Sequence, residues 1–474
     1  TQELISYQQS EDSPEALATV PMLSIEDINP KAQFFGVEEK QVGNNTVIYR
    51  NEHTNGIVYT NLYFDLRVLP LDQIQYASLL TRLLRLLNTE NYSYGDLDTE
   101  INNHTGGIYS YITYYLENND DSKLIPMYVV GSKSTSNEIQ KLIELNEEII
   151  CKTKYDDIDR LKTLLTRHFS QLDAQIKREG SNTAYLRYMS YFTNGGKFQE
   201  LINGYDYYTF INDLVTNFDS KSGEIVENLS KVALKVFTKE NLIVGTTCSA
   251  ENYKEFTGKL SQLTGKLNSE KPAYIPWEFK LAVNNEGFQT ASKVQYVYSG
   301  YDFRKLGYEW SGKMLVLNRA ISRNWLYQQL RVVGGAYGGY SRVSANGTFS
   351  FISYRDPNLK ETVDNYKAIP EFLESMEVDQ KELTQLIIGS ISSLDQPSSA
   401  AGRGETAFYN YFTKLNENFY QKERDEVLST SAQDLKSYAE LVAKIMEQNV
   451  LCVYGNSDKI EANGDLFKNF VRIE

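Results

Sequence analysis

Leu330-Arg-Val-Val-Gly-Gly-Ala-Tyr-Gly-Gly-Tyr340 places four glycines between a predicted helix and a predicted strand. Apolar residues at helical spacing lead into this segment from about Lys313, and a period-two pattern, Thr348–Tyr354, follows it. Glycine tolerates positive φ and lets a second backbone approach closely, so the segment predicts a deformable helix-to-strand turn. The turn carries a guanidinium, Arg331, and a phenol, Tyr337. Both groups can hydrogen-bond a peptide carbonyl and stabilise the oxyanion formed on attack, but neither can generate the nucleophile. An ordinary glycine-rich packing corner is the alternative interpretation.

The order of predicted elements around this turn also occurs earlier in the chain. A predicted helix, Leu71–Leu87, is followed by Thr105-Gly-Gly107, which occupies the place of Gly334–Gly339. The two halves close on similar segments, Glu240-Asn-Leu-Ile-Val-Gly245 and Gln448-Asn-Val-Leu-Cys-Val453. We therefore predict an internal duplication and an α+β fold with two homologous domains. Each domain is expected to be a mainly antiparallel sheet with helices packed on one face.

Proline-containing polar segments set the predicted domain boundaries. The seam between the halves is placed at Lys271–Gly287, where two prolines and an Asn-Asn-Glu-Gly cluster occur. Before the first strands, Ser24-Ile-Glu-Asp-Ile28 resembles a capped helix in a segment with little core material. The prediction is a helical linker over residues 1–34, a first domain over 35–275 and a second over 286–474.

Composition excludes several classes of partner. The chain has 474 residues and a formal net charge of −14, which argues against nucleic acid because phosphates require a basic surface. No apolar run approaches the roughly 20 residues of a membrane span, so no membrane partner is predicted. Cys151, Cys248 and Cys452 are odd in number and far apart, which favours buried thiols in a reducing compartment and a cytoplasmic location. The start at Thr1 suggests a processed chain or a fragment.

The three histidines do not form a recognisable metal motif. They are His53, His104 and His168, and no pair has the spacing of ligands on one helix. Glu52-His53 lacks a histidine at position 49, which is Tyr49. His104 is interpreted as a turn residue and His168 as part of a polar helical face. We predict no metal site in this chain.

A set of motifs spread over nearly the whole chain matches one known pattern. The motifs are Tyr7-Gln-Gln9 with Asp12, Pro21-Met-Leu-Ser-Ile-Glu-Asp-Ile28, Thr54-Asn-Gly-Ile-Val-Tyr59, Tyr92-Ser-Tyr94, Thr105-Gly-Gly-Ile108 and, most specific, Leu330–Gly339. Together they resemble the C-terminal half of the insulinase/pitrilysin-type zinc metallopeptidases (inverzincins), in the branch of presequence protease and falcilysin. This resemblance implies four α+β domains in the complete protein, which close like a clamshell on an unfolded peptide. Residues 1–34 would form its helical hairpin linker, and the two repeats its third and fourth domains.

The resemblance also implies roles for the glycine turn. Arg331 and Tyr337 look like the catalytic arginine and tyrosine that reach the substrate carbonyl at the zinc. The positions between and beside them are the expected peptide-binding backbone: Gly334, Gly335, Ala336 and Gly338. The family's zinc ligands lie in the N-terminal half, and the helix Leu71–Leu87 has leucines where such ligands would be. The cofactor expected in this chain is therefore none, with zinc in the complete enzyme, and the chain alone is expected to be inactive.

Two other functions remain open at this stage. The first is a non-catalytic structural subunit of the same fold, because that family also contains members that have lost catalysis. The second is a carbohydrate- or peptide-binding surface protein, because the chain contains 35 tyrosines and such surfaces suit these ligands.

Overall fold

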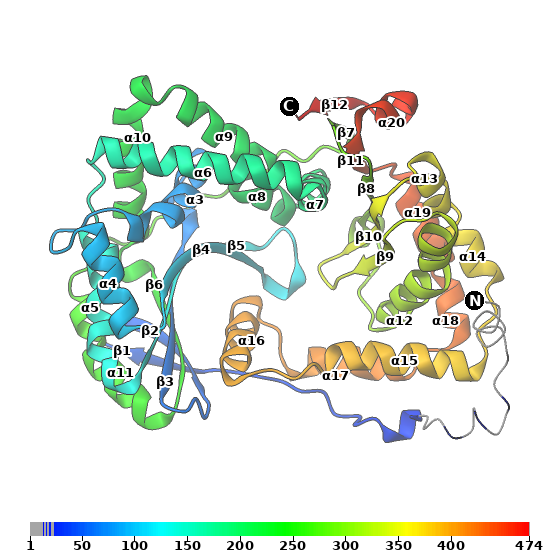
Figure 1. The fold of residues 1–474 in the computed structure, drawn as a ribbon. Coiled ribbons are helices and arrows are strands. Elements are labelled where there is room, and N and C mark those ends of the chain that lie inside the picture. Colours follow the sequence, from blue (N-terminus) through cyan, green and yellow to red (C-terminus); the bar gives the residue numbers. More distant parts are fainter. Residues whose placement is uncertain (1–12, 14–15, 17–18, 20–22, 474) are drawn as a thin grey trace.

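Two six-stranded sheets with helices packed against them make up the fold (Figure 1). This computed structural model describes residues 13, 16, 19 and 23–473. The first sheet contains β1 (Glu38–Val42), β2 (Asn45–Asn51), β3 (Ile57–Asp65), β4 (Ile108–Leu116), β5 (Leu124–Thr135) and β6 (Leu242–Cys248). These strands lie in the order β1-β2-β6-β3-β5-β4. The β2–β6 pairing is parallel and the other pairings of this sheet are antiparallel.

The second sheet repeats this arrangement. It contains β7 (Asn285–Thr290), β8 (Gln295–Asp302), β9 (Gly338–Val343), β10 (Thr348–Asp356), β11 (Leu451–Asn456) and β12 (Asn469–Arg472). The order is β12-β7-β11-β8-β10-β9, so β11 lies between β7 and β8 just as β6 lies between β2 and β3. Strand β7 pairs in parallel with β11 and β12, and the other pairings are antiparallel. The predicted α+β class with two homologous, mainly antiparallel sheets is confirmed.

Helices of each half cover one face of the sheet of that half and form its main core. In the first half they are α3 (Ile74–Leu83), α4 (Tyr94–His104), α5 (Ile139–Lys152), α6 (Ile158–Arg178), α8 (Asn194–Asn203), α9 (Tyr205–Thr216), α10 (Phe218–Val236) and α11 (Ala250–Thr264). In the second half they are α12 (Lys313–Ala320), the π-helix η9 (Ile321–Val333), α13 (Lys360–Lys367), α14 (Ile369–Ser375), α15 (Gln380–Leu394), α17 (Glu417–Leu428), α18 (Ala432–Ser437), α19 (Ala439–Glu447) and α20 (Ser457–Ala462). The predicted helix Leu71–Leu87 is α3 with a 3₁₀ turn at each end, and its leucines are buried because they face the sheet.

The opposite face of each sheet is covered by a helix from the other half (Figure 1). Helix α7 (Gly180–Ser190) packs on β8 and β11 of the second sheet, where Tyr188 is fully buried. Helix α16 (Ala400–Thr413) packs on β2, β4 and β6 of the first sheet through Phe408 and Phe412. We call α7 and α16 the exchanged helices. They join the two halves through packed side chains as well as through the chain itself.

The described part of the predicted linker is less helical than expected. The capped helix predicted at Ser24–Ile28 is a single 3₁₀ turn, Ile25–Asp27, although its capping box is present. Pro30 follows, and a proline restricts the residue before it to extended conformations, which prevents the turn from continuing as a helix. The chain then runs beside α17, where Arg424 donates to the carbonyl of Asn29 at 2.8 Å. Most of the predicted hairpin before this turn lies outside the described residues.

Two further sequence interpretations need correction. Cys248 and Cys452 are buried as expected, but Cys151 is exposed because it lies in the last turn of α5. His168 is buried rather than on a polar face, because α6 turns it toward Tyr207, whose hydroxyl lies 3.1 Å from its Nε2. Among the described residues, no helix combines the length and the apolar character needed to cross a bilayer.

Candidate functional site

Arg331 and Tyr337 lie together at the end of the long helix of the second half. Arg331 occupies the last turn of η9, and Tyr337 immediately precedes β9. The Arg331 Nη1 donates to the backbone oxygen of Tyr337 at 2.6 Å, and its Cζ lies 5.5 Å from the centre of the Tyr337 ring. The Tyr337 side chain is 65% exposed. The hydrogen bond therefore fixes the loop between the two residues while the phenol stays open to a ligand.

The glycine turn between them has a defined backbone path. Gly334 donates its N–H to the carbonyl of Gln329 at 3.0 Å, which continues the wide winding of the π-helix. Gly335 has φ +79°, a left-handed conformation that costs a residue with a side chain about 1 kcal/mol or more. The N–H of Ala336 then donates to the carbonyl of Leu330 at 2.8 Å, which closes the helix. The turn is thus hydrogen-bonded through its backbone.

A carboxamide that the sequence analysis did not single out holds this turn from behind. Asn358 Nδ2 donates to the carbonyl of Gly334 at 2.7 Å. Asp356 in turn accepts the backbone N–H of Asn358 at 2.9 Å and the hydroxyl of Thr362 at 2.6 Å. The Asp-Pro-Asn segment directly after a strand was the available signal, because Asx side chains before and after proline commonly organise turns.

The four positions predicted to bind peptide differ in what they expose. Gly335 is exposed and Gly334 and Gly338 are half-buried. The Ala336 side chain is buried in the core of the second half, so only its backbone faces outward. Peptide binding by these positions stays a prediction, and it would use backbone groups.

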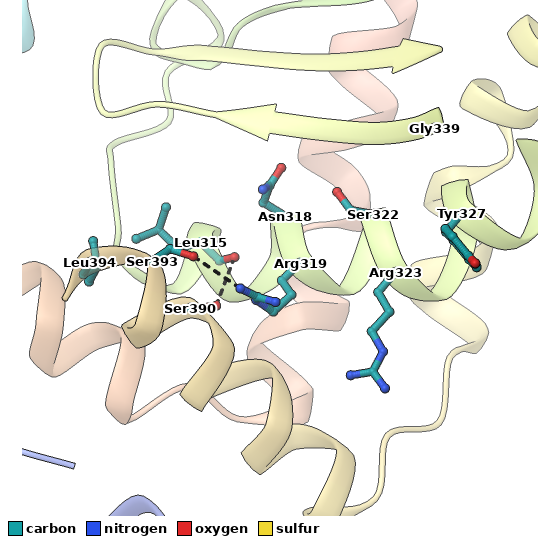
Figure 2. A pocket seen from close by; sticks show the side chains of 10 residues that line it. All are labelled: Leu315, Asn318, Arg319, Ser322, Arg323, Tyr327, Gly339, Ser390, Ser393 and Leu394. Carbon is teal, nitrogen blue, oxygen red and sulfur yellow. Dashed lines mark hydrogen bonds between the residues drawn. The ribbon is translucent and has the colours of Figure 1, made fainter. Parts of the chain in front are cut away.

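A cavity of about 620 Å³ lies next to the turn, between η9, β9 and α15 (Figure 2). Its lining is partly apolar and partly cationic: Leu315, Asn318, Arg319, Ser322, Arg323, Tyr327, Gly339, Ser390, Ser393 and Leu394. Tyr327 connects the cavity to the turn, because the Arg331 Cζ lies 5.7 Å from the centre of its ring. The cavity and the Arg331–Tyr337 pair therefore lie along one helix.

Two family descriptions match the chain. Residues 1–214 match the family described as Peptidase M16-C associated, and residues 285–455 match the PreP C-terminal domain. The chain belongs to the M16 peptidase family and corresponds to the C-terminal half of a presequence-protease-like member. The resemblance inferred from the sequence motifs is confirmed.

Relatives of this M16 half agree with that assignment. Protein HypA of Clostridium perfringens is 35% identical over 464 residues, which are 98% of this chain and 47% of the relative. Presequence protease 1, chloroplastic/mitochondrial, of Arabidopsis thaliana is 27% identical over 480 residues, 100% of this chain and 44% of the relative. The chain thus spans about half the length of these curated relatives. A solved structure from Pseudomonas fluorescens, titled peptidase M16 inactive domain, shares the fold with a TM-score of 0.62 and 13% identity, covering 88% of this chain and 97% of its own.

The described residues of this M16 half contain no group of three or more histidine, cysteine or carboxylate side chains placed to hold a metal ion. His104 Nδ1 lies 2.9 Å from the carboxylate of Glu138, and His53 is exposed on a different segment. Burial lowers the pKa of His168 to about 4, so this buried ring is neutral at ordinary pH. The histidines are therefore separated in space as they are in sequence.

Proposed function

We propose that this chain is the half of a zinc metalloendopeptidase that carries no metal and degrades short unstructured peptides together with an N-terminal half. The observation that carries the proposal is the Arg331–Tyr337 pair, in which an exposed phenol and a guanidinium are held side by side by a backbone hydrogen bond. Two donors at such a spacing suit a carbonyl oxygen that gains negative charge during attack. Zinc, bound by the N-terminal half, would supply the activated water for that attack.

The partners in this proposal are the N-terminal zinc-bearing half, in the same polypeptide or as a separate subunit, and the unfolded peptide. The two domains of the proposal are residues 35–275 and 286–474, with the helical hairpin over 1–34. Residues 269–284 carry no helix or strand, which supports the seam. The free state of the three cysteines supports a cytoplasmic location as part of the same proposal.

Replacement of Arg331 tests the proposed role directly. In the enzyme assembled from both halves, Arg331→Ala should lower the turnover of an unstructured neutral peptide by about 10²–10³, the usual size of losing one oxyanion donor. Tyr337→Phe should lower turnover less, because the ring and its packing remain. The measurement is kcat with a fluorogenic peptide, and Arg178→Ala, an exposed arginine at the end of α6, is the matched control.

Unchanged turnover of both site variants would exclude this role. It would favour the alternative, a non-catalytic structural subunit, for which the Arg331–Tyr337 pair has no chemical task.

The isolated chain provides an independent test. We expect the purified chain to take up no stoichiometric zinc and to leave the peptide intact until the N-terminal half is added. Metal content by mass spectrometry and the same peptide assay measure both quantities. One tightly bound zinc ion per isolated chain would contradict the proposal.

A further inference from the structure

The cavity beside the Arg331–Tyr337 pair contains two arginines one helical turn apart. Arg319 and Arg323 lie at positions i and i+4 of the continuous helix formed by α12 and η9, and both line the cavity (Figure 2). Like charges at this spacing destabilise a helix unless an anion lies between them. The chain has 62 acidic and 48 basic residues, so carboxylates are plentiful elsewhere. Such a pair without a carboxylate partner requires a reason.

Nearby carboxylates are engaged with other groups. Neither Arg319 nor Arg323 forms an ion pair with a described carboxylate. On α15, Glu382 accepts the carboxamide of Asn324 at 2.7 Å, and Asp395, just after α15, pairs with Arg424 at 2.7 and 2.9 Å. The charges of the arginine pair are therefore left for a ligand.

Arg319 is held in place by α15. Its Nη2 donates to the carbonyl of Gly389 and lies 3.3 Å from Ser393 Oγ. A Cβ at position 389 would lie 2.6 Å from the Arg319 Cζ, so the guanidinium can rest on α15 only because residue 389 is glycine. Burial and the neighbouring Arg323 both lower the pKa of Arg319, which is the direction expected of a cation that lacks a counter-charge.

The cavity also contains an unsatisfied amide. The Asn318 Oδ1 is buried and has no hydrogen-bond partner among the described residues. A buried oxygen without a donor costs free energy unless a ligand or water supplies one. A peptide backbone offers both groups that the cavity lacks, an N–H for this oxygen and a carboxylate for the arginines.

We propose that this cavity binds a carboxylate of the bound peptide, an acidic side chain or the C-terminal carboxylate. The inference rests on the proposed function, since it gives that peptide a second contact. Arg323 lies eight residues before Arg331, or roughly 12 Å along the helix axis at about 1.5 Å per residue. An extended peptide covers this distance in about four residues at ~3.3 Å each. The carboxylate therefore belongs about four residues from the scissile bond.

The test compares four peptides cleaved by the enzyme assembled from both halves. One is neutral with an amidated C-terminus, two carry glutamate four residues before or after the scissile bond, and one carries a free C-terminus at the same distance. We expect kcat/KM to be about tenfold higher for at least one of the carboxylate peptides than for the neutral peptide. Which peptide is favoured identifies the source of the carboxylate.

The double variant Arg319→Gln with Arg323→Gln should remove this preference and leave the cleavage of the neutral peptide unchanged. Gly389→Ala should reduce the preference as well, because it displaces the Arg319 guanidinium without removing its charge. Arg178→Gln removes one exposed positive charge elsewhere and should leave the preference intact. Circular dichroism and a urea unfolding curve show whether each variant is folded.

Three results would overturn the inference: no preference in the unmodified enzyme, a preference that survives the double variant, or loss of assembly of the two halves in size-exclusion chromatography. The last would assign the cavity to the contact between halves. A failure of the proposed function is distinguished by the neutral peptide, whose turnover responds to Arg331→Ala and does not depend on the arginine pair.

Discussion

At the scale of single residues, the most consequential group outside the candidate site is Glu200 on α8. Its carboxyl is fully buried, accepts the N–H of Asp206 at 3.2 Å and lies 3.4 Å from Arg187. Its second oxygen has no partner among the described residues. Arg187 also pairs with Glu286 on β7, at 2.5 and 3.2 Å, so this buried network joins the first half to the second.

Glu200 should make the stability of the protein depend on pH. Burial raises its pKa from 4.5 to about 7, against the opposing effect of Arg187. Between these two values the folded protein keeps a proton that the unfolded chain releases, so the free energy of unfolding falls as pH rises through this window. The full fall is about 3 kcal/mol. Glu200→Gln removes this titration, so relative to the unmodified protein it should gain stability from pH 5 to pH 7.5.

Urea unfolding at several pH values measures this difference. The exposed carboxyl of Glu278 provides the control, because Glu278→Gln should keep the pH dependence of the unmodified protein. Parallel stability curves for Glu200→Gln and the unmodified protein would show that Glu200 ionises normally in the fold.

At the scale of elements, the contact of η9 with β9 positions the Arg331–Tyr337 pair. Strand β9 crosses the helix at Gly339, where an added Cβ would lie 2.8 Å from Leu330 Cδ1 and 2.9 Å from the carbonyl of Leu326. The strand is also fixed to the helix by Ser341, whose N–H donates to Ser322 Oγ at 2.9 Å. Helix and strand can approach this closely because residue 339 has no side chain.

A pair of neighbouring glycines tests this contact. Gly339→Ala should lower the free energy of unfolding by about 1–3 kcal/mol, because the helix and the strand must move apart. Gly338→Ala should change it by less than about 0.5 kcal/mol, because its Cβ would meet nothing nearer than 3.8 Å. Chemical denaturation measures both. Equal effects of the two substitutions would show that the close approach at Gly339 does not limit the fold.

At the scale of the whole molecule, the exchanged helices α7 and α16 hold the two halves together. The Phe412 ring of α16 lies 4.6 Å from the ring of Tyr115 and 4.8 Å from that of Tyr63 on the first sheet, measured between ring centres. Around it, Arg403 pairs with Glu52 at 2.7 Å. Helix α16 thus closes a face of the first sheet that the first half leaves uncovered.

Loss of one ring should therefore destabilise the first sheet from a helix of the second half. Phe412→Ala should lower the free energy of unfolding by about 3–5 kcal/mol, the usual cost of truncating a buried phenylalanine. It should also speed proteolytic cleavage around residues 395–416. Phe470→Ala, at a side chain that is 49% exposed, is the control and should cost under about 1 kcal/mol. Stability and cleavage both equal to those of the unmodified protein would show that α16 is not needed to cover the sheet.

Local patterns predicted many elements correctly because their causes are local. The leucine spacing of α3 and the helix–glycine–strand order at Arg331 could be read without tertiary information. Strand β5 was not recognised, because Pro126 and Gly131 interrupt its apolar pattern. Helix α16 was not recognised either, because its first turns contain two glycines. One of them, Gly404, is required by the sheet, since a Cβ there would lie 2.0 Å from Thr247 Oγ1.

The sequence by itself determined the α+β class, the internal duplication, the family and the position of the Arg331–Tyr337 turn, because each depends on periodicity or on short motifs. Only the tertiary structure decided which helix covers which sheet, that His168 is buried, that Asn358 supports the turn and that Arg319 and Arg323 share a cavity. These features depend on contacts between residues far apart in the chain. Such contacts leave no regular spacing in the sequence, because packing selects them only after the two halves have folded against each other.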